Sequence, residues 1–375
     1  MVDGPAEAFL PVAAPVLIGN EKKYVLDCLD STWISSAGNY GERFESAFAD
    51  FCGVGHAIAC CNGTAALHLA LTALGLGQGD EVIVPSLTFV ATANAVTYCG
   101  ARPVFVDVDA DTWTMDAAAI EEKITTRTRG IVVVHLYGHP ADMDPILAVA
   151  ARHGLFVVED AAQAHGALYK GRRVGSLATI GTFSFYGNKI VTCGEGGMVV
   201  TNDRVLADRV RDLGGQWIHT DRHFQHATIG YNYRMTNIAA AIGLAQVEQV
   251  EWHMKRHLEA AAAYRDRLAG VSAVVPQAER EWARHAYWMF TVVLGTAVAK
   301  GRDDVIDALR RRRIEAKPAF QPLHLTPPYR GAGPSSRLPV SERIGARGIS
   351  LPTWAGLTAA DVRRVSTSLL ECLAS

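Results

Sequence analysis

Short apolar runs alternate with longer helical patterns along the first half of the chain, and this alternation restricts the possible folds more than any other feature. The runs lack the every-second-residue polarity of a half-exposed strand, so both faces of each expected strand must be buried. They cover residues 57–60, 81–84, 103–106, 130–135, 155–159 and 179–185. The pattern predicts an α/β fold with a mainly parallel sheet that carries helices on both faces.

The rest of the chain predicts a second, smaller α/β unit. Further strands are expected at residues 198–201, 288–294 and 349–352, and helices at 20–29, 40–51, 237–257, 302–312 and 359–373. At 375 residues the chain exceeds one ordinary domain. We therefore expect a large domain over residues 1–250, including the N-terminal segment, and a small C-terminal domain over residues 251–375.

Composition excludes several functional classes. The 36 basic and 38 acidic residues nearly cancel, so no overall field favours nucleic acid or an anionic membrane. Seven cysteines without a C-x-x-C pair, and thirteen histidines without H-E-x-x-H, indicate neither a disulfide framework nor a metal site. No stretch approaches the roughly 18 apolar residues of a membrane span, and the N-terminus lacks a signal-peptide pattern. We expect a cytoplasmic protein.

Lys189 and Asp160 carry the strongest chemical signal. Asp160 ends the expected strand at 155–159, at the edge where open α/β sheets bind ligands. Lys189 follows an aromatic strand and precedes the glycine-rich segment 194–197. A lysine that forms a Schiff base and a carboxylate that keeps a pyridinium nitrogen protonated are the two protein groups that pyridoxal phosphate chemistry needs. Considered alone, Lys189 can be a solvated loop lysine. Asp160 alone can be the polar end of a strand.

Asn62, Gly63 and Thr64 follow the first expected strand and open an apolar helix. Free amides at a helix N-terminus, next to a hydroxyl and a glycine, form a phosphate site. An ordinary Asn cap is the alternative. The segment 194–197 lacks the spacing of a nucleotide-binding P-loop, and residues 75–80 precede a strand where a dinucleotide loop would follow one. A nicotinamide oxidoreductase is therefore disfavoured.

The order of these motifs resembles the DegT/DnrJ/EryC1/StrS family of nucleotide-sugar aminotransferases, which have the aspartate-aminotransferase fold (fold type I). The resemblance extends from about residue 11 to the C-terminus. Segments 32–36, 134–138 and 231–237 are most similar to the perosamine-forming members, which aminate C4 of GDP-4-keto-6-deoxymannose. The resemblance rests on Asn62-Gly63-Thr64, Phe89, Asp160-Ala161-Ala162-Gln163, Phe183-Ser184-Phe185, Lys189, Gly194-Glu195-Gly196-Gly197 and Asn232-Tyr233-Arg234.

The resemblance implies pyridoxal 5'-phosphate as the cofactor, bound by the large domain and passing through its pyridoxamine form. Lys189 would hold the cofactor as a Schiff base, and Asp160 would meet its ring nitrogen. Gln163 would contact the phenolic oxygen, and Phe89 would stack on the ring. From the residues alone, Gln163 can equally be a first-turn helix residue and Phe89 a core aromatic.

The resemblance also implies a homodimer with shared active sites. Gly63, Thr64 and Ser184 would bind the cofactor phosphate, together with Asn232 from the neighbouring subunit. Without the resemblance, Asn232 is simply a turn-forming residue.

Two positions near the expected sugar site, Ser35 and His324, match the family, with glutamate as the expected amino donor. Gln163 and Gln321 depart from the perosamine-type pattern, so amination of dTDP-4-keto-6-deoxyglucose at C4 stays open. A sugar 3-dehydratase is a further alternative, but that branch has histidine in place of the lysine at 189. A regulator without turnover would need a DNA-binding module, and no basic arm precedes residue 20.

Overall fold

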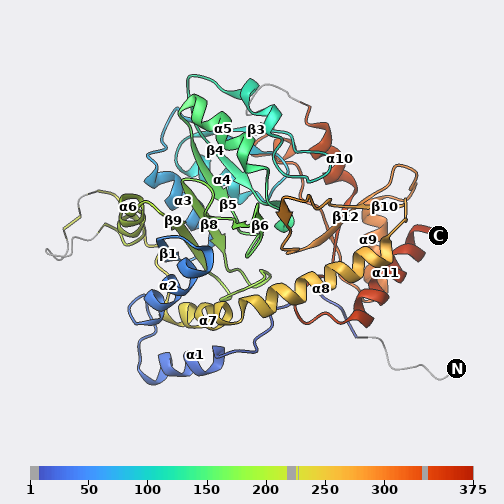
Figure 1. The fold of residues 1–375 in the computed structure, drawn as a ribbon, viewed down its shortest axis with the longest axis horizontal. Helices are drawn as coiled ribbons and strands as arrows, with labels where there is room; N and C mark the ends of the chain where they lie inside the picture. The colour runs from blue at the N-terminus through green and yellow to red at the C-terminus, as the bar shows by residue number, and fades with distance from the viewer. Residues whose placement is uncertain (1–7, 218–224, 227, 332–336, 375) are drawn as a thin grey trace.

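A seven-stranded sheet forms the centre of the N-terminal part of the chain in the computed structural model, which describes residues 8–217, 225–226, 228–331 and 337–374 (Figure 1). Its strand order is β1-β9-β8-β5-β4-β2-β3, and β9 alone runs antiparallel to its neighbours. The mainly parallel sheet predicted from the sequence is confirmed. The strands are β1 (His56–Cys60), β2 (Glu81–Pro85), β3 (Arg102–Val106), β4 (Thr128–Val134), β5 (Phe156–Asp160), β8 (Ile180–Ser184) and β9 (Gly197–Thr201).

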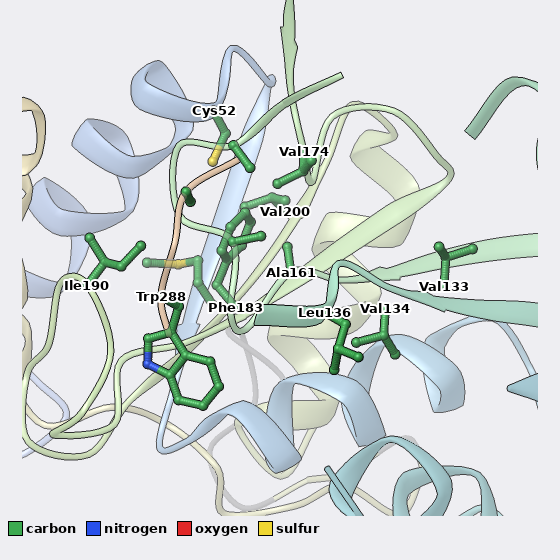
Figure 2. Packing of buried hydrophobic residues seen from close by; sticks show 14 of the residues in the cluster. Cys52, Val133, Val134, Leu136, Ala161, Val174, Phe183, Ile190, Val200 and Trp288 are labelled. Atoms are coloured by element: carbon green, nitrogen blue, oxygen red, sulfur yellow. The ribbon is translucent and has the colours of Figure 1, made fainter. Parts of the chain in front are cut away.

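Alternate residues of the central strands enter two separate hydrophobic cores, one on each face of the sheet. Val132 and Val158 lie in the core formed with α3, α4 and α6. Val133 and Val157 lie in the other core, formed with α2, α5 and α7, part of which Figure 2 shows around Phe183. Each fully buried aliphatic side chain contributes about 1.5–3 kcal/mol, which explains why both strand faces are apolar. The helices are α1 (Glu21–Asp30), α2 (Tyr40–Cys52), α3 (Gly63–Ala73), α4 (Ala91–Tyr98), α5 (Met143–His153), α6 (Arg204–Gly214) and α7 (Asn237–Glu248).

The prediction of a single helix over residues 237–257 is wrong, because the chain forms two helices there. α7 ends at Glu248, Gln249 leaves the helical conformation with φ −112° and ψ 13°, and α8 (Val250–Leu268) follows. α7 packs against α1 and α2, whereas α8 packs against α11 near the C-terminus. The first turns of α8 share a core with α7, through Val250 and Met254, whereas its later turns pack in the core of the C-terminal part. In Figure 1 α8 runs on from α7 with a slight bend.

The C-terminal part forms a four-stranded antiparallel sheet in the order β10-β12-β14-β13. The N-terminal segment joins this unit, since Leu10 bridges Ile314 and packs in its core. The domain boundary at residue 250 stays a prediction. Within the described ranges no helix is long and apolar enough to cross a membrane. The elements are β10 (Val274–Pro276), β12 (Phe290–Leu294), α9 (Arg302–Arg311), β13 (Lys317–Pro318), α10 (Pro339–Arg347), β14 (Gly348–Leu351) and α11 (Ala359–Ala374), with a small sheet of β6 (Leu168–Tyr169), β7 (Arg172–Arg173) and β11 (Ala283–Arg284).

Candidate active site

A cavity of about 590 Å³ lies at the carboxyl ends of the central strands, where Asp160 ends β5 and Ser184 ends β8. Ligands of open α/β sheets bind at this edge. The cavity brings together most of the residues that the sequence predicted for the cofactor. Those lining it are Gly63, Thr64, Phe89, Asp160, Gln163, Ser184 and Lys189.

Asp160 is a buried carboxylate on the face of the sheet covered by α3 and α4. Thr92 on α4 donates from Oγ1 to its Oδ2 at 2.8 Å, and the Ala162 N–H donates to its Oδ1 at 3.2 Å. Burial raises the pKa of Asp160, while these hydrogen bonds and the positive charge of Lys189 oppose that shift. A buried carboxylate in this setting is stabilised by a cation, and a protonated ring nitrogen meets that need.

Glu159, the preceding residue, points to the opposite face of the sheet and has a different role. Its carboxylate accepts three backbone N–H groups of the turn 175–178 at 2.7–2.8 Å. His135 lies 3.0 Å away through Nε2, and its Nδ1 accepts from the Ala141 N–H, so Nε2 is the nitrogen that donates to Glu159. Because both of its carboxylate oxygens are engaged in these hydrogen bonds, Glu159 stabilises the turn 175–178, and it does not line the cavity.

Lys189 stands in the turn after β8, half-buried, with its Nζ 3.8 Å from the centroid of the Trp288 ring. The Trp288 Nε1–H donates to the Asn188 carbonyl at 2.6 Å, which fixes the ring beside the lysine. Burial lowers the pKa of Lys189 to about 8, and the Asp160 carboxylate opposes this shift. At pH 7 roughly one lysine in ten is then the neutral amine that attacks a carbonyl.

The start of α3 forms a cradle for an anion. Asn62 caps the helix by accepting the Ala65 N–H at 2.8 Å, and the two amides before it, of Gly63 and Thr64, have no acceptor within the helix. A Cβ at Gly63 would lie only 2.6 Å from the Ser184 Cβ. Glycine therefore lets the helix start approach the end of β8, and amides and hydroxyls converge where a phosphate fits.

Aromatic side chains that the sequence argument missed form one wall of the cavity. Tyr137 and Phe320 stack with centroids 5.4 Å apart and an interplanar angle of 2°, and Trp288 lies nearly parallel to both. Gln163 faces this wall, and its Oε1 accepts the Tyr137 N–H at 2.8 Å. Tyr137 follows an expected strand, as Phe89 does, so the same position in the pattern indicates Tyr137 as a candidate for ring stacking. Phe320 had no local signal.

Three predicted site residues lie outside the cavity in this single chain. Asn232 and Ser35 are exposed. His324 makes a hydrogen bond of 2.6 Å to the Ser86 hydroxyl through Nδ1, and its Nε2 lies 3.4 Å from Glu342. The roles predicted for these residues in subunit sharing and sugar binding stay predictions.

The family model of the DegT/DnrJ/EryC1/StrS aminotransferases matches residues 15–370. The chain belongs to this aminotransferase family. A GDP-perosamine synthase of Caulobacter vibrioides is 53% identical over 97% of this chain and 98% of the relative, and one of Escherichia coli O157:H7 is 48% identical over the same shares. The crystal structure of DesI in the presence of its TDP-sugar product is similar, with 36% identity, a TM-score of 0.91 and coverage of 99% and 95%.

DegT-family aminotransferases depend on pyridoxal phosphate, and the cavity fits that cofactor. The glycine cradle at the start of α3 suits its phosphate, and a side chain at Gly63 would fill that cradle. The buried Asp160 suits its ring nitrogen, and Lys189 lines the same cavity with a lowered pKa. Both ends of the cofactor therefore find complementary groups in one site.

Proposed function

We propose that this enzyme transfers an amino group from glutamate to the C4 ketone of GDP-4-keto-6-deoxymannose. The observation that carries the proposal is the presence of Lys189 and Asp160 in one cavity beside the α3 cradle. The choice of sugar substrate is supported by the 48–53% identity to GDP-perosamine synthases over nearly the whole chain.

The residues of the cavity have separate roles in the proposed transamination. When bound, the cofactor would supply an aldehyde carbon that takes up the amino group, with loss of the carbonyl oxygen as water, and a protonated ring that accepts carbanion electrons. Gly63, Thr64 and Ser184 would hold its phosphate, and Asp160 would keep the proton on its ring nitrogen. With a pKa of about 8, Lys189 both releases and accepts a proton near neutral pH, so it moves the proton at the sugar C4.

The aromatic wall and Gln163 orient the ring. Gln163 is held by the Tyr137 N–H through its oxygen, which leaves its amide NH2 to donate to the phenolic oxygen. Tyr137, Phe320 and Trp288 exclude water from the side where Lys189 acts, because their rings stack into one apolar surface.

A homodimer with shared sites and a cytoplasmic location complete the proposal. Asn232 is exposed, and the exposed apolar residues Trp33 and Ile34 adjoin Ser35. A second copy of the chain can therefore cover these apolar residues, and Asn232 can reach the active site of that copy. All seven cysteines are free thiols, which suits a reducing compartment.

The alternatives from the sequence are less well supported. The protein whose structure was solved with a TDP-sugar product is 36% identical, against 53% for the Caulobacter GDP-perosamine synthase. A 3-dehydratase would need histidine where Lys189 stands.

The test is to incubate the enzyme and glutamate with GDP-linked and dTDP-linked 4-keto-6-deoxyhexoses and to measure amino-sugar mass. Amination of the GDP-linked sugar is expected. Lys189→Ala should abolish turnover and the absorbance of the covalently held cofactor, whereas Lys255→Ala, on an exposed face of α8, should preserve both. Product formation by Lys189→Ala would contradict the mechanism, and amination of the dTDP sugar alone would move the proposal to that substrate.

A further inference from the structure

We propose that Lys317 binds the diphosphate of the nucleotide-sugar substrate, an inference that rests on the proposed function. Four residues with charged side chains line the cavity within the described part of the chain: Asp160, Lys189, Glu195 and Lys317. The first two are committed to the cofactor, and Glu195 repels a phosphate. His68 also lines the cavity, but burial lowers the pKa of its ring, so it is neutral at pH 7. Lys317 is therefore the cation available to a second anionic ligand.

Lys317 belongs to a different wall from the cradle that fits the cofactor phosphate. It begins β13, where it pairs in register with Ser350 of β14, and both residues line the cavity. The cradle is built by α3 and β8 of the seven-stranded sheet, whereas Lys317 comes from the C-terminal sheet. The two anion sites are thus on separate elements, and a diphosphate at Lys317 need not compete with the cofactor for the amides of α3.

The Lys317 ammonium is held only weakly by its present partner. Its Nζ lies 3.6 Å from Glu315 Oε1, and the lysine side chain is 55% exposed, so solvent screens this ion pair. The other carboxylate oxygen of Glu315 accepts the Val12 N–H at 2.9 Å, which ties the carboxylate to the N-terminal segment. A lysine on a flexible stem with three rotatable donors can leave such a partner for a phosphate, which carries more charge and more acceptor oxygens.

The chemistry of the substrate directs its diphosphate away from Lys189, toward the outer part of the cavity. The sugar reacts at C4, and its diphosphate hangs from C1 on the opposite side of the hexose ring. With C4 beside Lys189, the diphosphate extends away from the reacting end. The amino donor differs, since its α-carboxylate is bonded to the carbon that reacts and so enters deeply. A half-exposed lysine on the outer wall matches the diphosphate better than the donor carboxylate.

The experiment compares Lys317→Met and Lys317→Arg with Lys255→Ala, whose exposed lysine has a similarly long ion pair of 3.9 Å to Glu259 and does not line the cavity. Binding of GDP to the cofactor-loaded enzyme is measured by calorimetry, and the KM for the sugar nucleotide by turnover. The glutamate half-reaction is followed separately through the absorbance of the cofactor. This separation distinguishes the two candidate ligands of Lys317.

For Lys317→Met, the Kd for GDP and the KM for the sugar nucleotide are expected to rise about ten- to hundredfold, as for a lost charge-assisted hydrogen bond. The glutamate half-reaction should keep its wild-type rate, and Lys317→Arg should recover most of the binding. Salt should weaken GDP binding to the wild type more than to Lys317→Met, because exposed charge pairs are screened.

Two results would overturn the inference. One is GDP binding and a sugar-nucleotide KM that are the same in Lys317→Met and Lys255→Ala. The other is a slowed glutamate half-reaction with unchanged GDP binding, which would assign Lys317 to the donor. A wild-type enzyme that binds GDP but shows no glutamate half-reaction would refute the proposed function instead, and the GDP titration would still decide the role of Lys317.

Discussion

Gly63→Ala tests the cradle at the start of α3 most directly. The new Cβ would lie 2.6 Å from the Ser184 Cβ, 3.1 Å from its Oγ and 3.2 Å from its Cα. Carbon atoms prefer separations of about 3.5–4.0 Å, so the contact with the Ser184 Cβ is roughly 1 Å too close. β8 is paired on both sides, by β5 and β9, and cannot yield easily. The start of α3 must therefore move away.

Two effects of opposite sign decide the change in stability. Overpacking costs about 1–3 kcal/mol, while replacing glycine by alanine inside a helix gains up to about 1 kcal/mol. Gly63 is the first residue of α3, where that gain is smaller, so a net loss of about 1–2 kcal/mol is expected. Displaced amides also lose charge-assisted hydrogen bonds of about 1.5–3 kcal/mol, which lowers the affinity for pyridoxal phosphate about ten- to hundredfold.

Urea unfolding of the cofactor-free protein measures the first effect, and titration with pyridoxal phosphate measures the second. Gly187→Ala is the matched control, because a Cβ there meets no atom closer than the Gly194 carbonyl oxygen at 3.9 Å. Adding Ser184→Gly to Gly63→Ala removes the closest contacts and should restore part of the stability. Wild-type cofactor affinity in Gly63→Ala, or equal damage from Gly187→Ala, would refute the reasoning.

Further predictions concern three charged residues, namely Lys189 and the two carboxylates at the end of β5. Burial lowers the pKa of Lys189 from 10.5 to about 8, so the rate of cofactor attachment to the cofactor-free protein should rise with pH around a midpoint near 8, and a stopped-flow midpoint near 10.5 would contradict this. The unfolded chain binds more protons between those pH values, so the contribution of Lys189 to the free energy of unfolding should rise with pH in the same window. Asp160→Asn removes a buried charge whose pKa is raised, so at pH 7 the cofactor-free protein should be at least as stable as wild type while turnover falls on the order of 10²–10³-fold. Glu159→Gln should instead lower the free energy of unfolding by about 2–3 kcal/mol in urea, because an amide NH2 would face the N–H donors of the turn 175–178. Equal effects of the two variants on stability would contradict the assignment of the two carboxylates to opposite faces of the sheet.

Local sequence signals predicted the elements and the most reactive residues. Runs of apolar residues placed the strands to within a few positions, because burial of both faces leaves a pattern that is readable in a short window. The Asn62 cap and the glycine after it were visible for the same reason. The alternation along β5 explains why Glu159 and Asp160, neighbours in the sequence, have unrelated surroundings. The sequence pointed to Asp160, whereas the hydrogen bonds of Glu159 to the turn 175–178 became visible only in the folded sheet.

The amino-acid sequence by itself determined the α/β class, the strand ends that carry Asp160 and Ser184, and the lysine suited to a carbonyl, since these depend on local periodicity and residue chemistry. Tertiary structure alone decided which distant segments meet. It stacked Phe320 and Trp288 on Tyr137, brought Lys317 of the C-terminal sheet to the cavity, and ended α7 at Glu248. Such contacts arise from the packing of one unit against another, and that packing leaves no trace in any short stretch of the chain.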